Sequence, residues 1–245
     1  MIKITNESKL FFQINKKDFT ADIINSPDAN GDLFIPQFVV HENQNYIITS
    51  IGENSFKRNY KIKSIQFAND SKVCSIGKEA FFNSSLKKII IPSSLKTIKE
   101  RSFSWCENLQ SVEFPENSEL VSIEDNAFAY SLITHFSIPS NVSKIAESSF
   151  SGCKNLKTFE FPIQSKLKLI EKNTFFNSAV EYIRIPSSVY CIESNAFTDC
   201  ENLRTIKFSN YSNLQIIDSY AFSSSSISTI TIPSSVRQIK DHCFF

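Results

Sequence analysis

The chain has 245 residues, 21% of them charged, and a formal net charge of +1 at pH 7. Charges of both signs are interspersed, which argues against a nucleic-acid-binding protein and against a polybasic membrane patch. The longest apolar runs, such as residues 89–91, are far too short to span a bilayer, and the N-terminus lacks the apolar core of a secretory signal.

The first 50 residues follow no repeat and predict short strands separated by turns. Apolar and β-branched residues in segments 10–14 and 19–24 indicate strands, and the Asn, Asp, Pro and Gly of residues 25–32 indicate turns. A repeat array needs a cover for its first hydrophobic edge. We therefore expect an N-terminal β cap at residues 1–50, followed by the array at residues 51–245.

The rest of the chain is periodic. A motif beginning Ile-Pro-Ser recurs every 47 residues, from Ile91, Ile138, Ile185 and Ile232. Phenylalanines alternate in steps of 25 and 22 residues, at positions 56, 81, 103, 128, 150, 175, 197, 222 and 244. The average coil therefore has about 23 to 24 residues, a period typical of solenoids built from leucine-rich repeats.

Each coil contains a stretch in which apolar and polar residues alternate, such as residues 180–185, and this alternation predicts a strand. Proline follows most of these stretches, and its missing N–H stops strand pairing and turns the chain. We expect one parallel sheet in a curved, right-handed solenoid. Its eight repeat strands should end near residues 67, 91, 114, 138, 161, 185, 208 and 232.

The return path carries an Ile, a small residue and the Phe at relative positions 0, +4 and +5, as in Ile123, Ala127 and Phe128. This spacing predicts a short helical turn with two inward anchors on the return side of each coil. Stacked coil upon coil, the nine phenylalanines should form a continuous internal spine.

Cysteines recur at one place in the 47-residue unit, at Cys106, Cys153 and Cys200. Coils stacked about 4.8 Å apart would separate these residues by about 10 Å. A disulfide needs Cα atoms within about 7 Å. We therefore predict small buried side chains here, and also at Cys243, in place of disulfides or a metal site.

The last copy of the repeat breaks off at Phe245 without a visible polar cap. We expect an array that is truncated or uncapped at its C-terminus.

The motifs Ile-Pro-Ser-Ser-Val from Ile185, Ile-Gly-x-x-Ala-Phe from Ile76 and Cys-x-Asn-Leu from Cys106 together resemble the BspA-like leucine-rich-repeat surface proteins of bacteria and parasitic protists. The resemblance covers about residues 33–245. It implies a repeat solenoid of the leucine-rich-repeat type and a non-enzymatic protein at the cell surface or outside the cell. Such a protein would act in adhesion to host cells, matrix or other microbes.

The sequence shows no arrangement typical of an enzyme. The histidines His41, His135 and His242 lie far apart in the repeat pattern, and with four glycines in the chain a Gly-rich phosphate loop is hardly possible. We expect no catalytic residue, no cofactor and no metal.

Two outward columns of the repeat strands change chemistry from coil to coil and should pave the concave sheet face, the surface that solenoids offer to partners. Such variation suits protein binding, for which Tyr and Arg are favoured anchors. The candidate binding residues are Lys88, Glu113, His135, Glu160, Tyr182, Arg184 and Lys207.

The expected partner is a protein or glycoprotein, without nucleic-acid binding or direct membrane insertion. The alternative is an intracellular scaffold that uses the same face. Sequons at Asn6, Asn69, Asn83, Asn141 and Asn210 would accept glycans only in a secretory pathway, so their occupancy would decide the compartment.

Overall fold

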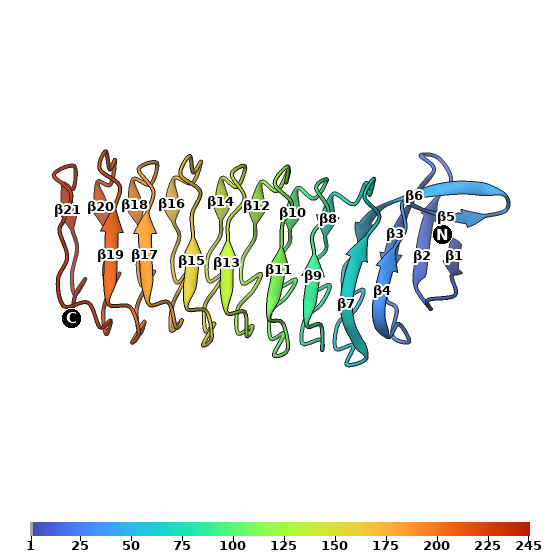
Figure 1. Cartoon of the computed structure of the whole chain (residues 1–245), viewed down its shortest axis with the longest axis horizontal. Coiled ribbons are helices and arrows are strands. Elements are labelled where there is room, and N and C mark those ends of the chain that lie inside the picture. Colours follow the sequence, from blue (N-terminus) through green and yellow to red (C-terminus); the bar gives the residue numbers. More distant parts are fainter. Residues whose placement is uncertain (1) are drawn as a thin grey trace.

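The computed structural model describes residues 2–245, with side chains from residue 4 onward, so Met1 of the expected cap lies outside the described residues. Within this range the chain forms 21 strands arranged as an elongated row of coils, with the two termini at opposite ends (Figure 1). None of the described residues belongs to a helix that could cross a membrane.

The N-terminal end of the row is covered by an antiparallel unit. Strands β1 (Ile2–Thr5), β2 (Phe11–Asn15) and β3 (Thr20–Ile24) form a meander, and β5 (Phe38–His41) forms a hairpin with β6 (Gln44–Ile51). β3 pairs in parallel with β6, which pairs in turn with the first coil. The strands predicted at residues 10–14 and 19–24 are thus β2 and β3. Because β6 belongs to both parts, the boundary at residue 50 stays a prediction.

The coils carry two sets of parallel strands, which we call the long-strand ladder and the short-strand ladder. The long-strand ladder contains β4 (Gly31–Ile35), β7 (Ile62–Phe67), β9 (Lys88–Ile90), β11 (Ser111–Glu113), β13 (His135–Ser137), β15 (Thr158–Glu160), β17 (Tyr182–Ile185) and β19 (Thr205–Phe208). The short-strand ladder contains β6, β8 (Ser75–Ile76), β10 (Thr97–Ile98), β12 (Ser122–Ile123), β14 (Lys144–Ile145), β16 (Leu169–Ile170), β18 (Cys191–Ile192), β20 (Ile216–Ile217) and β21 (Gln238–Ile239).

The prediction of a single sheet was therefore wrong. The nine members of the short-strand ladder mark about nine coils, and each ladder is interrupted once, between β11 and β13 and between β14 and β16. No strand forms near residue 232, where one was expected to end. Ile230 and Ile232 are only partly buried in this segment. The predicted curvature and handedness stay predictions.

The turn segments around the phenylalanines are not helical, so the helical turns expected on the return side are wrong. In the first coil the amides of Asn54, Phe56 and Arg58 donate to carbonyl oxygens of the next coil, at N···O distances of 3.0, 2.7 and 2.8 Å. The intervening Lys57 amide bonds within the turn, to Asn54 at 3.3 Å. An α-helix uses its amides within its own segment. Here every second amide is donated to the neighbouring coil instead.

This alternation requires left-handed backbone at two positions of each turn. Asn54 and Arg58 have φ of 57° and 55°. Two left-handed positions four residues apart recur in the turn segments along the array. Asparagine tolerates this region better than most residues. It occupies the first of the two positions at Asn54, Asn126, Asn173 and Asn195.

The predicted phenylalanine spine is confirmed. Successive rings from Phe56 to Phe244 stack nearly parallel, with centroids 5.0 to 5.8 Å apart. All of these side chains are buried except Phe244, which is 45% exposed. Phe136 and Phe159, from the long-strand ladder, add edge-on contacts to Phe150. The core is therefore a continuous apolar column along the row.

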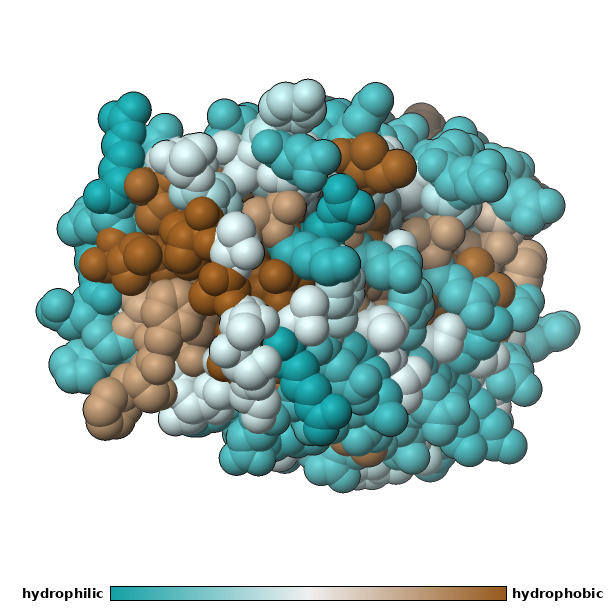
Figure 2. Space-filling model, turned by 60° about the vertical axis from the view of Figure 1, so that its left-hand side comes forward, coloured by the Kyte–Doolittle hydropathy of each residue, from teal (hydrophilic) through white to brown (hydrophobic). Residues whose placement is uncertain are grey.

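The last coil is the most exposed part of the array. Phe245 is 84% exposed and Ile239 is 47% exposed. Figure 2 turns this end of the molecule toward the viewer and shows apolar side chains gathered on it.

The repeated cysteines are buried and unpaired, as predicted. The Sγ atoms of Cys106, Cys153 and Cys200 donate to backbone carbonyls one coil earlier, at 2.9, 3.2 and 3.0 Å. All six cysteines are free, and only Cys74 is exposed. Burial raises the pKa of the Cys106 thiol to about 11 and that of Cys153 to about 12. Since the thiolate is the reactive form, these groups should be inert at neutral pH.

We expect titration of the native protein with a thiol reagent at pH 8 to detect one rapidly reacting cysteine, Cys74, and all six after denaturation. Burial raises the pKa of Cys106 and Cys200 to about 11 and also raises the pKa of Cys243, so these thiols stay protonated at pH 8. The variant Cys74→Ser should lose the fast phase. A second fast thiol in this variant would contradict the described packing.

Removing one ring from the middle of the spine should destabilise the protein strongly. We expect Phe128→Ala to cost about 3–5 kcal/mol, measured as a lower urea midpoint, because the cavity lies among packed rings. The control is Phe244→Ala at the exposed end of the same stack, where a much smaller loss is expected. Equal losses from the two variants would show that the stack does not stabilise the array through burial.

Candidate functional site

The long-strand ladder displays all seven predicted binding residues on its outer surface, where each is exposed. They form two columns. One contains Lys88, His135 and Tyr182, and the other contains Glu113, Glu160, Arg184 and Lys207. Strand register places Tyr182 beside Thr205 and Arg184 beside Lys207. The structure therefore brings Glu160, Tyr182, Arg184 and Lys207 together, whereas Lys88 lies several coils away in the N-terminal half.

The charges in the N-terminal half of this face neutralise one another. The Lys88 ammonium lies 2.7 Å from the Glu113 carboxylate, which also accepts a hydrogen bond from Ser111 at 3.1 Å. The hydrogen bond from Lys88 holds the pKa of Glu113 below its ordinary value. His135 is hydrogen-bonded to Thr158 at 2.6 Å. These side chains are already partnered within the sheet.

The C-terminal half differs because two of its exposed cations, Arg184 and Lys207, form no ion pair, whereas Lys157 there lies 3.8 Å from Glu181. Among the described residues, neither Arg184 nor Lys207 has a carboxylate within 4.0 Å. Lys207 instead lies 6.0 Å from the centroid of the Tyr182 ring, a cation–π arrangement, and Tyr182 is 42% exposed. We call Tyr182, Arg184 and Lys207 the aromatic–cationic patch. An exposed tyrosine with two unneutralised cations is suited to an acidic partner surface.

Two further residues beside this patch were missed at the sequence level. Ile163 is 101% exposed and Tyr211 is 89% exposed, and both line a cavity of about 400 Å³ together with Arg184. Each lies in a loop that follows a long strand. The signal was present in the sequence, since these positions are apolar where the equivalent loops have Asn, Asp, Glu or Gln.

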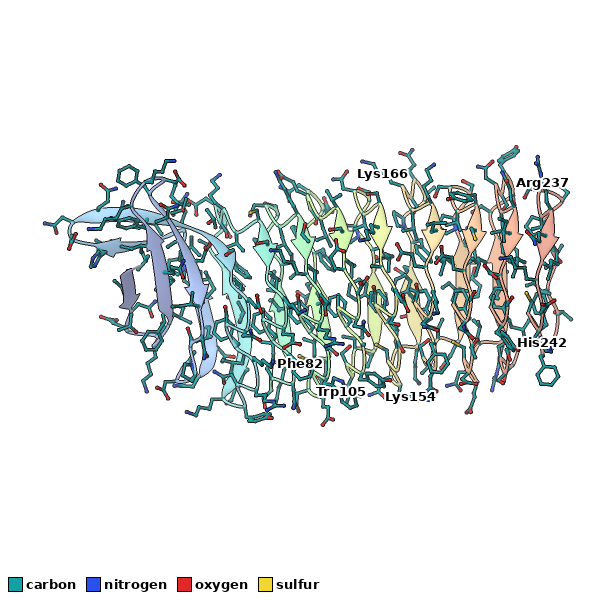
Figure 3. The ribbon with its side chains drawn as sticks, turned by 180° about the vertical axis from the view of Figure 1, so that it is seen from behind. Phe82, Trp105, Lys154, Lys166, Arg237 and His242 are labelled. Carbon is teal, nitrogen blue, oxygen red and sulfur yellow. The ribbon has the colours of Figure 1, made fainter. Side chains whose placement is uncertain are left out.

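The edge formed by the turn segments also carries aromatic residues, but it is a weaker candidate for a binding site. Figure 3 shows Phe82 and Trp105 along the turn edge, away from Lys166 in a loop on the other edge. The Trp105 ring stacks on Tyr130 with centroids 4.4 Å apart. The Tyr130 ring in turn covers Gly152, where a Cβ would come within 2.5 Å of it. One face of the Trp105 ring is therefore covered by Tyr130, although Trp105 as a whole is 42% exposed.

Within residues 2–245, no three His, Cys, Asp or Glu side chains gather as a metal site would require.

Comparison with sequence families finds the BspA type leucine-rich repeat region in this chain. Six copies of it match, over residues 40–133 and 121–245. The chain belongs to the BspA-type leucine-rich-repeat family. No curated protein matches the sequence significantly.

Solved structures, among them leucine-rich-repeat proteins, share the fold. A leucine-rich repeat protein from Bacteroides ovatus is 26% identical with a TM-score of 0.80, covering 94% of this chain and 59% of that one. This chain thus spans less than two thirds of the Bacteroides protein. The T. pallidum leucine-rich repeat protein is 16% identical with a TM-score of 0.65, covering 90% and 88%. The pneumococcal vaccine antigen PcpA has the same identity and TM-score, covering 96% of this chain and 71% of PcpA.

Proposed function

We propose that this protein is a non-enzymatic binding module that attaches to a protein or glycoprotein partner at the cell surface or outside the cell. The single observation that carries this proposal is the aromatic–cationic patch. Arg184 and Lys207 are exposed without a carboxylate partner, whereas the equivalent Glu113 is neutralised within the sheet. A partner with acidic groups would complete the missing interactions.

The family supports the binding role, because leucine-rich repeats typically bind proteins. The location outside the cell is supported by the resemblance to surface proteins, and one structural neighbour is described as a vaccine antigen. In this proposal residues 1–50 act as the cap of the array and residues 51–245 present the binding face.

Protease shaving of intact cells that express the protein tests its location. We expect peptides of this chain in the released fraction, with a cytosolic protein as the control for lysis. Full protection of the expressed chain would favour the alternative, an intracellular scaffold.

Binding by the patch is tested with the purified chain on intact epithelial cells and on surfaces coated with fibronectin, laminin or collagen. We expect Tyr182→Ala combined with Lys207→Ala to weaken binding about tenfold or more, because aromatic and cationic anchors dominate such interfaces.

The repeat supplies a matched control for this variant. Lys88 and Glu113 lie two 47-residue periods before Tyr182 and Lys207, so Lys88→Ala combined with Glu113→Ala removes side chains at equivalent positions. Binding should survive in this variant because its two charges neutralise each other. Equal losses in the two double variants would contradict a role specific to the patch.

A further inference from the structure

Long and short coils alternate, so long and short loops alternate along the edge of the array that follows the long strands. In the coils that follow a 25-residue phenylalanine step, which we call long, Ile76 lies 11 positions after Ile65. In the coils of the 22-residue step, which we call short, Ile98 lies 9 positions after Ile89. The additional residues lie in the loop after the long strand. Long loops are therefore two coils apart, about 10 Å at the spacing of parallel strands, with a shorter Pro-Ser corner between them. This leaves room for one inserted side chain.

One of these gaps is built differently from the others. It lies between the loops at residues 161–163 and 209–211, crosses the corner at Pro186 and Ser187, and encloses about 400 Å³. We call it the Arg184 notch. Its two rims carry Ile163 and Tyr211, which are almost wholly exposed. Large apolar side chains held in water at both rims of one cavity are what a partner surface would cover.

The cavity also contains a cation that the equivalent positions of the other short coils lack. The positions equivalent to Arg184 in the other short coils are Ile90, Ser137 and Thr231. Glu160 lines a neighbouring opening with Arg184, but their charged atoms are more than 4.0 Å apart. The guanidinium forms no ion pair among the described residues, although Glu160 lies on the neighbouring strand, and a carboxylate ligand matches its geometry best.

We propose that the Arg184 notch binds an acidic side chain of an extended peptide segment in the partner, with an adjacent apolar residue packed between Ile163 and Tyr211. This inference rests on the proposed function and specifies the partner's chemistry. We favour a peptide over an acidic sugar because Ile163, Pro186 and Tyr211 give the cavity apolar surface that an apolar side chain would cover, although Ser187, Ser209 and Asn210 also line it.

The test uses the full chain with methyl-labelled isoleucine and follows the Ile163 methyl signal by NMR. The probes are the blocked peptide Ac-Leu-Asp-Phe-Gly-NH2, its Asn counterpart, and glucuronate. We expect the Asp peptide to shift the Ile163 signal in a saturable way. It should bind about tenfold more tightly than the Asn peptide, because a charge-assisted hydrogen bond to Arg184 is lost in the latter.

Substitutions taken from equivalent coils keep the fold intact. Arg184→Thr introduces the residue found one period later, at Thr231, and Ile163→Asn introduces the residue found two periods earlier, at Asn69. Arg184→Thr should weaken the Asp peptide about tenfold and leave the Asn peptide unchanged. Ile163→Asn should weaken both peptides alike, followed through the remaining isoleucine signals.

Three results would overturn the proposal: no shift with either peptide, equal affinities for the two peptides, or a response to glucuronate alone. Failure here is distinguishable from failure of the proposed function. If Arg184→Thr binds cells and matrix normally while the Tyr182 and Lys207 double variant does not, the binding face stands and the notch is refuted.

Discussion

The structure depends on the hydrogen-bond register between the turn segments of successive coils. In each coil the phenylalanine amide donates to a backbone carbonyl of the next coil, as Phe56 does to Ala80 at 2.7 Å. This bond places each ring over its neighbour at centroid distances of 5.0 to 5.8 Å. Because each coil contacts mainly its neighbours, one repeated interaction aligns every inward side chain of the array.

The same register decides which outward side chains meet. Equivalent positions line up as columns, so two residues 47 or 94 places apart have the same setting but different chemistry. Lys88 and Glu113 close an ion pair at 2.7 Å, whereas the equivalent Tyr182 and Lys207 form an aromatic–cation contact that leaves positive charge exposed. A uniform scaffold thus carries an ion pair in one half of the face and two cations without an ion-pair partner in the other.

Repetition made much of this fold predictable, and its failures have identifiable causes. The spacing of Ile123, Ala127 and Phe128 is compatible with a helical turn, but every second amide there, including that of Phe128, bonds to a coil more than 20 residues away. Local spacing does not reveal such partners. The short-strand ladder was missed because members such as Thr97–Ile98 have two residues, too few for alternation to show. The seven surface candidates lie where expected, but nothing in the pattern distinguished the partnered from the unpartnered ones.

By itself, the sequence determined the period, the inward phenylalanine and cysteine columns and the outward variable columns, because each is a local pattern repeated in register. Only the tertiary structure decided that Lys88 is neutralised and that Arg184 and Lys207 are not, since ion pairing depends on distances between side chains in different coils. It also decided that Ile163 and Tyr211, 48 residues apart, line one cavity. Coil stacking, which sets those distances, is a property of the folded array and of no single repeat.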